Sequence, residues 1–403
     1  MGKKIKILAL SFLFPNRVHP NHGIFVLNRL KALSKYVDIK IINPLPWSPV
    51  HKYIDRYKQY DSIPHKDNIQ GLEVYHPRYF SIPRYLKGME PKNYLKSIEP
   101  VIEKIKSEFD FDIVDMHWTF PDLPAGISIS KKYNTKSIVT LRGLEALHLN
   151  DNDSRKNAVK QGLISVDKII ALSNELMQYG EELSSQQKKS QVIINGADTN
   201  EFSYIPMSEC RKTLGINCSE KIILSVGSLI KRKGFDLLID SLAELRKQSM
   251  FSDLKLYIVG SEGPEGDYRK NLFDQIKSLG LENAVIFSGQ VENSKLKYWY
   301  NSADLFCLSS RGEGSPNVLS EALACGCPVV SSDVGSARNI IQPVNDVGIC
   351  IDSFSVDHLT KAISKLLHTT MDREKSAKEF SVFNWDWCAK NVVEVYKDCL
   401  SIN

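Results

Sequence analysis

The chain has 403 residues, of which 42% are hydrophobic and 25% charged, and its formal net charge is +5. This composition is ordinary for a globular protein and argues against a disordered chain, a collagen or a coiled coil, while the length predicts two or three domains of roughly 150 residues. The charge excess is too small to indicate a nucleic-acid partner, and apolar stretches such as residues 5–14 are shorter than the roughly 20 residues of a membrane helix.

The chain opens with Met-Gly-Lys-Lys and runs directly into an apolar segment. This start is basic but has no small-residue cleavage site, so we expect no signal peptide and a cytoplasmic location. All 8 cysteines follow residue 209, and their spacings are not those of a zinc site. Because most have apolar neighbours, we expect small buried side chains in a reducing compartment.

In the first half of the chain, short apolar runs alternate with helical patterns, which is typical of βαβ units with a parallel sheet. Residues 24–33 have apolar side chains at helical spacing. The predicted strands are residues 4–12, 37–42, 113–116, 137–141, 168–172 and 191–194. Between about residues 47 and 99 the pattern gives way to a segment that contains Pro, Tyr and Lys, which we interpret as an irregular insertion.

A second α/β series begins near residue 220. Its predicted strands are residues 221–226, 255–259, 284–288, 304–308 and 328–331, and its predicted helices are residues 235–245, 268–279, 295–301 and 317–324. Residues 200–220 are polar and lack strong periodicity, so we place the boundary beside them, with domains at 1–197 and 198–382 and a last segment at 383–403. The expected ligand site is a crevice faced by the carboxyl ends of strands, most simply between the two halves.

The most informative segment is residues 310–321, Ser-Arg-Gly-Glu-Gly-Ser-Pro-Asn-Val-Leu-Ser-Glu, which follows a predicted strand and opens a helix. Ser315 is a favourable N-cap, and Pro316 fits the first helical position. The amides at the helix start would then suit a phosphate. These amides belong to Asn317, Val318 and Leu319.

Two acidic residues flank this helix start. Glu313 precedes the expected cap, and Glu321 lies about one turn into the helix on the same stripe as Asn317. The two carboxylates can therefore face different parts of one ligand. A capped helix whose acidic residues only favour its dipole is an equally weighted alternative.

A second candidate segment is residues 225–235, Ser-Val-Gly-Ser-Leu-Ile-Lys-Arg-Lys-Gly-Phe, which again follows a predicted strand. It places three consecutive cations where the sheet crevice should open. A diphosphate needs compensating positive charge, so this loop pairs naturally with the helix start described above. The alternative is a solvated basic turn.

These two segments together resemble the retaining glycosyltransferases of the GT-B fold, in glycosyltransferase family four. Glu313 and Glu321 match the family's Glu-x7-Glu signature, and residues 226–234 match its Gly-Arg-Leu-x-Lys-Gly loop. Further segments similar to family motifs are residues 20–26, 192–202, 259–264 and 322–330. The resemblance covers nearly the whole chain.

The resemblance implies an α/β chain of the GT-B fold, with two Rossmann-like domains facing a central crevice and a C-terminal helix that crosses back to the N-terminal domain. It implies transfer of a sugar, with retention, from a UDP- or GDP-sugar to a hydroxyl of a glycan or lipid-linked acceptor in cell-surface polysaccharide biosynthesis, such as that of capsule or lipopolysaccharide. The donor would bind the C-terminal half and the acceptor the N-terminal half. Cations and amides neutralise the leaving group, so no metal or other cofactor is expected.

The resemblance also implies residue roles. Lys233 would contact the diphosphate, Glu321 the ribose and Glu313 the donor sugar. The segment Gly314, Ser315, Pro316, Asn317, Val318 and Leu319 would hold phosphate and sugar oxygens, and Gly23, Gly227 and Ser228 would line the donor site. His117, which ends a predicted strand, matches a position near the acceptor crevice, and a structural role is equally weighted.

Three positions depart from the family pattern. Ser228 stands where the family has an arginine for the diphosphate, so Lys231 or Arg232 would supply that charge. Arg142 replaces a histidine near the reaction centre, and it is a poor base because the pKa of arginine is above about 12. Asn339 replaces an acidic residue. A non-catalytic nucleotide-sugar-binding homologue and a nucleotide-sugar epimerase are therefore kept as alternatives.

Two further features carry less weight. The run Asp151-Asn152-Asp153 spells a metal-binding motif of another glycosyltransferase fold, and we interpret it as a solvated loop. Lys131, Lys132 and Lys136, with the aromatic and basic residues 79–87, would allow peripheral contact with the inner face of an anionic membrane. Surface lysines are more often only solvated.

Overall fold

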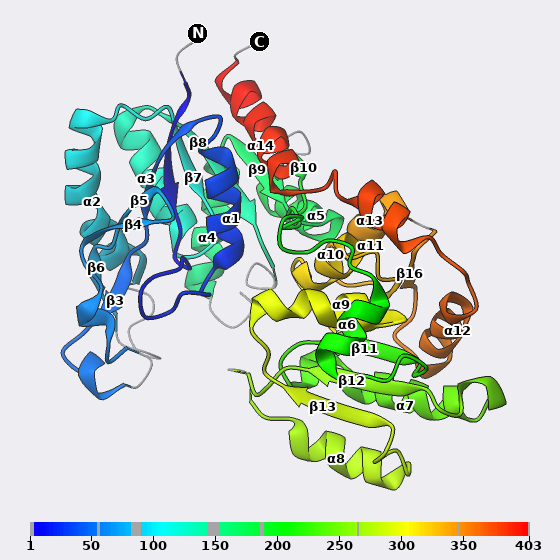
Figure 1. Ribbon diagram of the computed structural model, residues 1–403. Helices are drawn as coiled ribbons and strands as arrows, with labels where there is room; N and C mark the ends of the chain where they lie inside the picture. The colour runs from blue at the N-terminus through cyan, green and yellow to red at the C-terminus, as the bar shows by residue number, and fades with distance from the viewer. Residues whose placement is uncertain are drawn as a thin grey trace. The chain divides into compact units, whose positions relative to one another are not determined.

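The computed structural model describes residues 4–54, 57–81, 90–143, 153–185, 189–263, 266–344 and 346–401. The chain divides into two compact units (Figure 1). The first contains Met1–Asn195 together with Trp385–Asn403, and the second contains Gly196–Asn384. Each unit has its own sheet and hydrophobic core.

The first unit is built on a mainly parallel sheet. Its strands, in order across the sheet, are β10 (Ser190–Val192), β9 (Lys168–Ala171), β8 (Lys136–Leu141), β7 (Ile113–Met116), β1 (Lys6–Leu10), β2 (Asp38–Ile42), β5 (Leu72–Tyr75) and β4 (Lys66–Ile69). β4 is antiparallel to β5, and the other neighbouring pairs are parallel. β3 (Leu45–Trp47) and β6 (Arg78–Phe80) form a separate small sheet. The parallel core predicted from the alternating apolar runs is confirmed.

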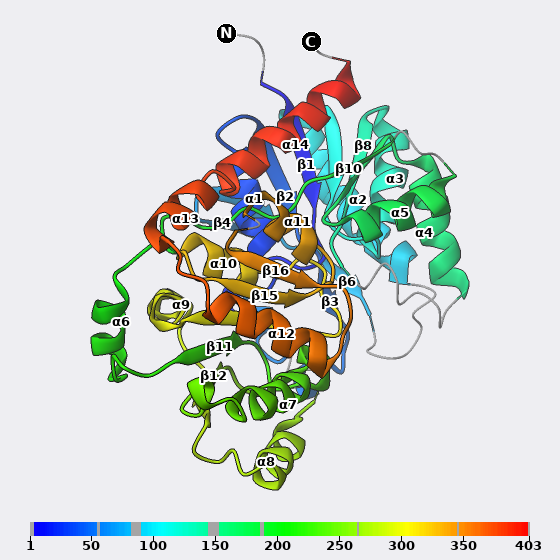
Figure 2. The ribbon, with the colours of Figure 1, turned by 90° about the vertical axis from the view of Figure 1, so that its right-hand side faces the viewer.

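The helices of the first unit are α1 (Ile24–Leu33), α2 (Glu90–Glu108), α3 (Asp122–Tyr133), α4 (Asp153–Ser165), α5 (Asn174–Ser184) and α14 (Trp385–Leu400). α14 comes from the end of the chain and lies beside α1, as both views show (Figures 1 and 2). Val392 and Tyr396 of α14 are buried in one apolar cluster with Val26 and Leu30 of α1. The last helix is therefore part of the core of the first unit.

The second unit repeats the pattern with an entirely parallel sheet. Its strands, in order, are β13 (Val285–Gly289), β12 (Lys255–Val259), β11 (Ile222–Val226), β14 (Leu305–Leu308), β15 (Val329–Ser332) and β16 (Gly348–Ile351). Its helices are α6 (Met207–Leu214), α7 (Phe235–Arg246), α8 (Arg269–Ser278), α9 (Leu296–Ser302), α10 (Asn317–Ala324), α11 (Ala337–Ile341), α12 (Val356–Leu367) and α13 (Arg373–Phe380). α7, α8 and α12 share one buried cluster, and α9, α10 and α13 form another group (Figure 2).

The expectation of an irregular insertion between residues 47 and 99 is wrong for much of that segment. β4, β5, β6 and the start of α2 lie within it. Gln70 and Gly71 connect β4 to β5 with φ angles of 50° and 90°, and two successive positive φ values are typical of a tight hairpin turn. These strands are short and only about half of their residues are apolar, so the sequence shows no clear alternation of apolar and polar residues there. α6 likewise lies inside the polar segment 200–220.

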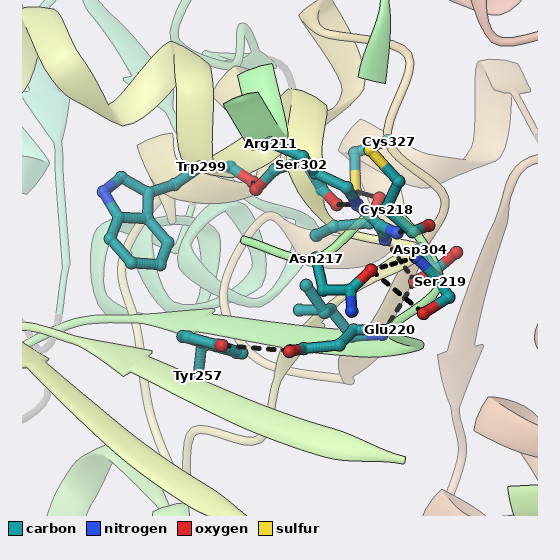
Figure 3. Close-up of polar contacts among 12 residues, drawn as sticks. Arg211, Asn217, Cys218, Ser219, Glu220, Tyr257, Trp299, Ser302, Asp304 and Cys327 are labelled. Atoms are coloured by element: carbon teal, nitrogen blue, oxygen red, sulfur yellow. Dashed lines mark hydrogen bonds and ion pairs between the residues drawn. The ribbon is translucent and has the colours of Figure 1, made fainter. Parts of the chain in front are cut away.

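A buried arginine joins three elements at the amino edge of the second sheet (Figure 3). Arg211 on α6 donates to the carbonyl oxygens of Ser302 at 3.0 Å and Cys218 at 2.7 Å, and to Asp304 Oδ2 at 2.9 Å. Asp304 Oδ2 also accepts the amide of Ile222 at 2.7 Å, at the first residue of β11. A single ion pair therefore fixes α6 against the beginnings of β11 and β14.

The cysteines are all free, and Cys210, Cys307, Cys325, Cys327, Cys388 and Cys399 are buried. This confirms that most of them are small core side chains. In the described residues, we find no helix with the length and apolar character needed to cross a membrane. Residues 82–89 and 151–152, which carry most of the predicted aromatic-basic stretch and of the Asp-Asn-Asp run, lie outside the described residues.

Replacing Arg211 should destabilise the second unit. Arg211→Leu removes the arginine donor from the buried Ser302 carbonyl oxygen, from the Cys218 carbonyl oxygen and from the Asp304 carboxylate, so we expect the free energy of unfolding to fall by about 3 kcal/mol. Urea denaturation measures this change. Lys247→Ala removes an exposed ion pair with Glu244 and should cost at most about 1 kcal/mol. An Arg211→Leu midpoint equal to that of the control would contradict this role.

Candidate functional site

The two segments singled out from the sequence lie against each other at the carboxyl edge of the second sheet. One follows β11 and the other follows β14. The amide of Arg311 donates to the carbonyl oxygen of Arg232 at 2.7 Å. The Arg311 guanidinium binds both carboxylate oxygens of Asp236, at 2.8 and 2.7 Å. The loop after β11, which carries the three cations, and the loop after β14, which carries Glu313, are thus joined by a backbone hydrogen bond and an ion pair.

Glu313 is the centre of this contact. Lys233 Nζ donates to its Oε1 at 2.7 Å, Ser310 Oγ donates to the same oxygen at 2.6 Å, and Arg232 Nη1 lies 3.3 Å from Oε2. The side chains of Lys233 and Glu313 are only 16% and 11% exposed. Of the two cations considered as replacements for the family arginine, Arg232 therefore points to this carboxylate, while Lys231 is exposed.

Glycines make the close approach of these loops feasible. A Cβ on Gly227 would lie 3.2 Å from Lys233 Cε, so the missing side chain leaves room for the lysine stem. Gly335, at φ 53°, would place a Cβ 2.2 Å from the Gly314 carbonyl oxygen, and no neighbouring atom could move aside. Ser228 lies at the same loop, where its Cβ is 2.8 Å from the Cβ position of Gly263. The contact with Lys233 gives Gly227 a structural reason.

The predicted cap of the helix start is wrong by one residue. α10 begins at Asn317, and Pro316 occupies the N-cap position with φ −76° and ψ 91° and no side-chain cap. Ser315 Oγ instead makes a hydrogen bond of 2.9 Å with Ser336 Oγ, which draws it away from the helix. The Leu319 amide donates to the Pro316 carbonyl oxygen at 3.0 Å, so it is not directed to a ligand as expected. The amides of Asn317 and Val318 occupy the first helical positions, where the helix itself offers no acceptor.

Glu321 lies one turn further along α10 and has a buried partner. The hydroxyl of Tyr300, which is fully buried, donates to Glu321 Oε2 at 2.8 Å. Burial raises the pKa of Glu321 to about 7, although the hydrogen bond from Tyr300 acts in the opposite direction. This carboxyl group therefore changes charge near neutral pH.

The first unit brings two predicted residues into direct contact. His117 follows β7 and Arg142 follows β8, and Arg142 Nη2 lies 2.7 Å from His117 Nδ1. An arginine only donates, so Nδ1 accepts and the neutral ring carries its proton on Nε2. Burial, together with the charges of Arg142 and Arg29, holds the pKa of His117 well below its ordinary value. The Arg142 guanidinium also lies over the Phe25 ring, 5.3 Å from its centre.

The backbone conformation at position 23 requires a glycine. It precedes α1 with φ 72°, and a Cβ there would lie 2.4 Å from the Leu13 carbonyl oxygen. The turn that carries the predicted glycine motif is therefore pressed against the loop after β1. Any substitution at Gly23 would be strained as well as crowded.

The predicted site residues thus form two groups, one in each unit. Gly23, His117 and Arg142 lie in the first unit, and Gly227, Ser228, Lys233, Glu313, Gly314, Ser315, Pro316, Asn317, Val318, Leu319 and Glu321 lie in the second. Sequence reasoning missed Ser310 and Tyr300, which bind the two key carboxylates. Ser310 belongs to the segment 310–321 described above, whereas Tyr300 lies in the predicted helix 295–301, where no motif marks it. Together with Arg232, the second-unit group combines two cations, a helix start and two carboxylates, which suits an anion that carries hydroxyl groups.

Comparison with known proteins agrees with this chemistry. Residues 207–381 match the family model for glycosyl transferases group 1, and residues 57–201 match the model for glycosyltransferase family 4. TuaC of Bacillus subtilis, a glycosyltransferase assigned to teichuronic acid biosynthesis, is 27% identical over 371 residues that cover 90% of each chain.

Solved structures show the same fold. The sucrose-phosphate synthase of Thermosynechococcus elongatus superposes with a TM-score of 0.76 at 18% identity, over 99% of this chain and 100% of the other. HepE of Anabaena in complex with UDP gives a TM-score of 0.70 at 20% identity, over 98% of this chain and 100% of the other. The expected fold class is confirmed, and the two family models together span most of the sequence. The chain therefore belongs to the family four glycosyltransferases, retaining enzymes of the GT-B fold that use nucleotide-sugar donors.

Proposed function

We propose that this enzyme transfers a sugar from a UDP- or GDP-sugar to a hydroxyl of a glycan or lipid-linked acceptor in the biosynthesis of a cell-surface polysaccharide. The observation that carries the donor side is the Lys233–Glu313 pair beside the start of α10. The similarity to TuaC supports a role in surface-polysaccharide biosynthesis. The likeness to HepE, which was solved with UDP, supports UDP as the nucleotide of the donor.

In this proposal the donor displaces Glu313 from its cations. Lys233 and Arg232 bind the diphosphate, with Arg232 replacing the charge that Ser228 lacks. The released Glu313 carboxylate then accepts hydroxyl groups of the donor sugar, and Glu321 accepts those of the ribose. Support comes from the convergence of Lys233 and Arg232 on one carboxylate, because a dianionic diphosphate is a stronger partner for two cations than a single carboxylate is.

The transfer breaks the bond between the anomeric carbon and the diphosphate and forms one to the acceptor oxygen on the same face of the sugar. The acceptor's proton leaves with the diphosphate. Lys233 and Arg232 stabilise the charge that develops on the leaving group, so the proposed reaction uses no metal. In this proposal Arg142, whose Nη2 lies 2.7 Å from His117 Nδ1, contributes positive charge from the first unit.

The basic patch expected to contact an anionic membrane is partly neutralised by neighbouring carboxylates. Lys132 Nζ lies 2.8 Å from Glu103, and Lys136 Nζ lies 3.2 Å from Asp167. Two cations of the expected basic patch are therefore already paired with carboxylates. Any attraction of this patch to anionic lipid would rest on the remaining lysine, Lys131, and on residues outside the described part of the chain.

Removing the proposed diphosphate cations should weaken donor binding. We expect Lys233→Ala and Arg232→Ala each to raise the Kd for the preferred nucleoside diphosphate about tenfold or more, since a charge-assisted hydrogen bond contributes about 1.5–3 kcal/mol. Calorimetric titration with UDP, GDP and their sugars measures this. Lys231→Ala, which removes the neighbouring exposed cation, is the matched control and should change Kd less than twofold.

The same panel tests the whole proposal when acceptor extract is added. Release of nucleoside diphosphate that depends on the extract and is lost in Glu313→Ala supports sugar transfer. Tight donor binding without turnover in any extract would favour the non-catalytic homologue. Turnover of the donor without an acceptor would favour the epimerase. Binding that is equal in wild type, Lys233→Ala and Arg232→Ala would refute the donor site.

Donor affinity should depend on the ionisation of Glu321. With a pKa of about 7 the carboxyl is mostly protonated at pH 6 and mostly ionised at pH 8, and only the ionised form accepts from both ribose hydroxyls. We therefore expect the Kd to fall by up to about tenfold from pH 6 to pH 8. Glu321→Gln should bind more weakly and lose this part of the pH dependence. Identical pH profiles for the two proteins would contradict the assignment.

A further inference from the structure

Four large apolar side chains are exposed on the small sheet of the first unit and on the turn that follows β3. Trp47 and Phe80 are 44% and 39% exposed, and Val50 and Tyr53 are 45% and 75% exposed. We call these four residues the aromatic patch. Exposed apolar side chains that occur singly need no explanation, whereas a group that includes three aromatic rings indicates a contact surface.

The backbone brings these side chains together. Trp47 of β3 and Phe80 of β6 are register partners in a parallel pair, so their side chains leave the same face of the small sheet (Figures 1 and 2). The carbonyl oxygen of Val50 accepts the amide of Tyr53 at 3.1 Å in a 3₁₀ turn, where side chains three positions apart lie above one another. The aromatic patch therefore consists of a strand pair and the turn that begins at Val50.

The opposite face of the small sheet is packed. Tyr79, next to Phe80 on β6, is 1% exposed, and its ring lies edge to face against Tyr94 of α2 with 5.3 Å between the ring centres. Asn93 Nδ2 at the start of α2 donates to the Phe80 carbonyl oxygen at 3.1 Å. The patch is thus held outwards on a fixed support, and the packing beneath it leaves its rings uncovered.

Exposed lysines lie beside this support. Lys92 and Lys96 are one turn apart on the same face of α2, and neither forms an ion pair with a described residue. Among the side chains that the structure describes in residues 45–98, one carboxylate is exposed, that of Asp61. The exposed lysines of the same range are Lys58, Lys66, Lys92 and Lys96. The surface around the patch therefore has an excess of positive charge.

An anionic lipid surface fits both features. Tryptophan and tyrosine combine an apolar ring with a polar N–H or O–H group, and they favour the headgroup region of a bilayer. Lysines are attracted to anionic headgroups, and their stems lie along apolar surface while the ammonium group stays in water. Exposed aromatic rings beside uncompensated cations are the two contributions that hold a protein on such a surface.

We propose that the aromatic patch and the start of α2 dock the first unit on an anionic lipid bilayer. Because only a few side chains enter the headgroup region, the contact is reversible. This surface differs from the basic patch of Lys131, Lys132 and Lys136. The inference rests on the proposed function for its purpose, since an enzyme that uses a lipid-linked acceptor works at the bilayer surface.

The experiment measures how the full-length protein sediments with vesicles of phosphatidylcholine and with vesicles of equal parts phosphatidylcholine and phosphatidylglycerol. We expect binding to the anionic vesicles, weakened by added salt because the attraction is screened. Lys92→Ala combined with Lys96→Ala should lower the partition coefficient about twentyfold, since each lysine near an anionic surface contributes about fivefold. Trp47→Ala combined with Tyr53→Ala should lower it about tenfold or more, because two rings no longer enter the headgroup region.

Matched controls remove the same kinds of group from the second unit. Lys270→Ala combined with Lys277→Ala removes two exposed lysines of α8, and Phe273→Ala removes a ring that is 48% exposed. Both controls should change the partition coefficient less than twofold. No binding of wild type to the anionic vesicles, or wild-type binding by either patch variant, would overturn the inference. A dimer that dissociates in Trp47→Ala with Tyr53→Ala, without vesicle binding, would assign the patch to a second copy instead.

Two arms separate this inference from folding and from the proposed function. The lysine pair and the single variant Tyr53→Ala change side chains that lie mostly in solvent, so they lower vesicle binding without unfolding the first unit. Patch-dependent vesicle binding without sugar transfer to any lipid extract supports the docking surface and removes the lipid-linked acceptor from the proposed function. Sugar transfer to a lipid extract by a protein that does not bind anionic vesicles keeps the proposed function and overturns the docking surface.

Discussion

The ion pair between Lys233 and Glu313 is the interaction on which the second unit's site depends. It joins the loop after β11 to the loop after β14, and both charges are nearly buried. Such a pair is tolerated only when the remaining valences are satisfied, which Arg232 and Ser310 do for the carboxylate. Gly227 leaves room for the Lys233 side chain, and Gly335, after β15, allows the backbone of Glu313 and Gly314 to approach it closely.

This arrangement also bears on the stability of the proposed diphosphate site before a ligand binds. Lys233 and Arg232 repel each other, and the Glu313 carboxylate between them offsets part of their positive charge. In the proposed reaction the cost of separating the pair is offset by the diphosphate, which offers more negative charge and more acceptors. The cations therefore do not have to be ordered at the moment of binding, because they are already directed to one point.

In the first unit the buried Arg142 makes a hydrogen bond with the His117 imidazole and not with the nearby Asp115 carboxylate. Arg142 faces a neutral imidazole, whose pKa is depressed by burial and by two arginines. Tyr396 of the last helix donates to Asp115 Oδ2, which lies 3.5 Å from His117 Nε2 with no hydrogen bond between them. Arg142 stands where the family pattern has a histidine, so the group that faces His117 here is a guanidinium.

Much of the fold followed from local patterns. Parallel strands of a buried sheet read as apolar runs, so β7 and β12 were predicted with the bounds that the structure has, and the helical pattern did the same for α10. The hairpin of β4 and β5 was missed because its strands are half exposed and depend on pairing with β2 for their stability. Ser315 was misplaced as a cap because its competing partner, Ser336, lies 21 residues away.

The sequence by itself determined the alternation of elements, the motif residues and the family, because these are properties of neighbouring residues. Only the tertiary structure decided which groups meet. It paired Lys233 and Arg232 with Glu313, gave Glu321 its buried tyrosine, and set Tyr396 behind Asp115 across 281 positions of the chain. Burial and long-range contact set the pKa of a carboxyl group and the tautomer of a histidine, and neither quantity can be derived from residue order alone.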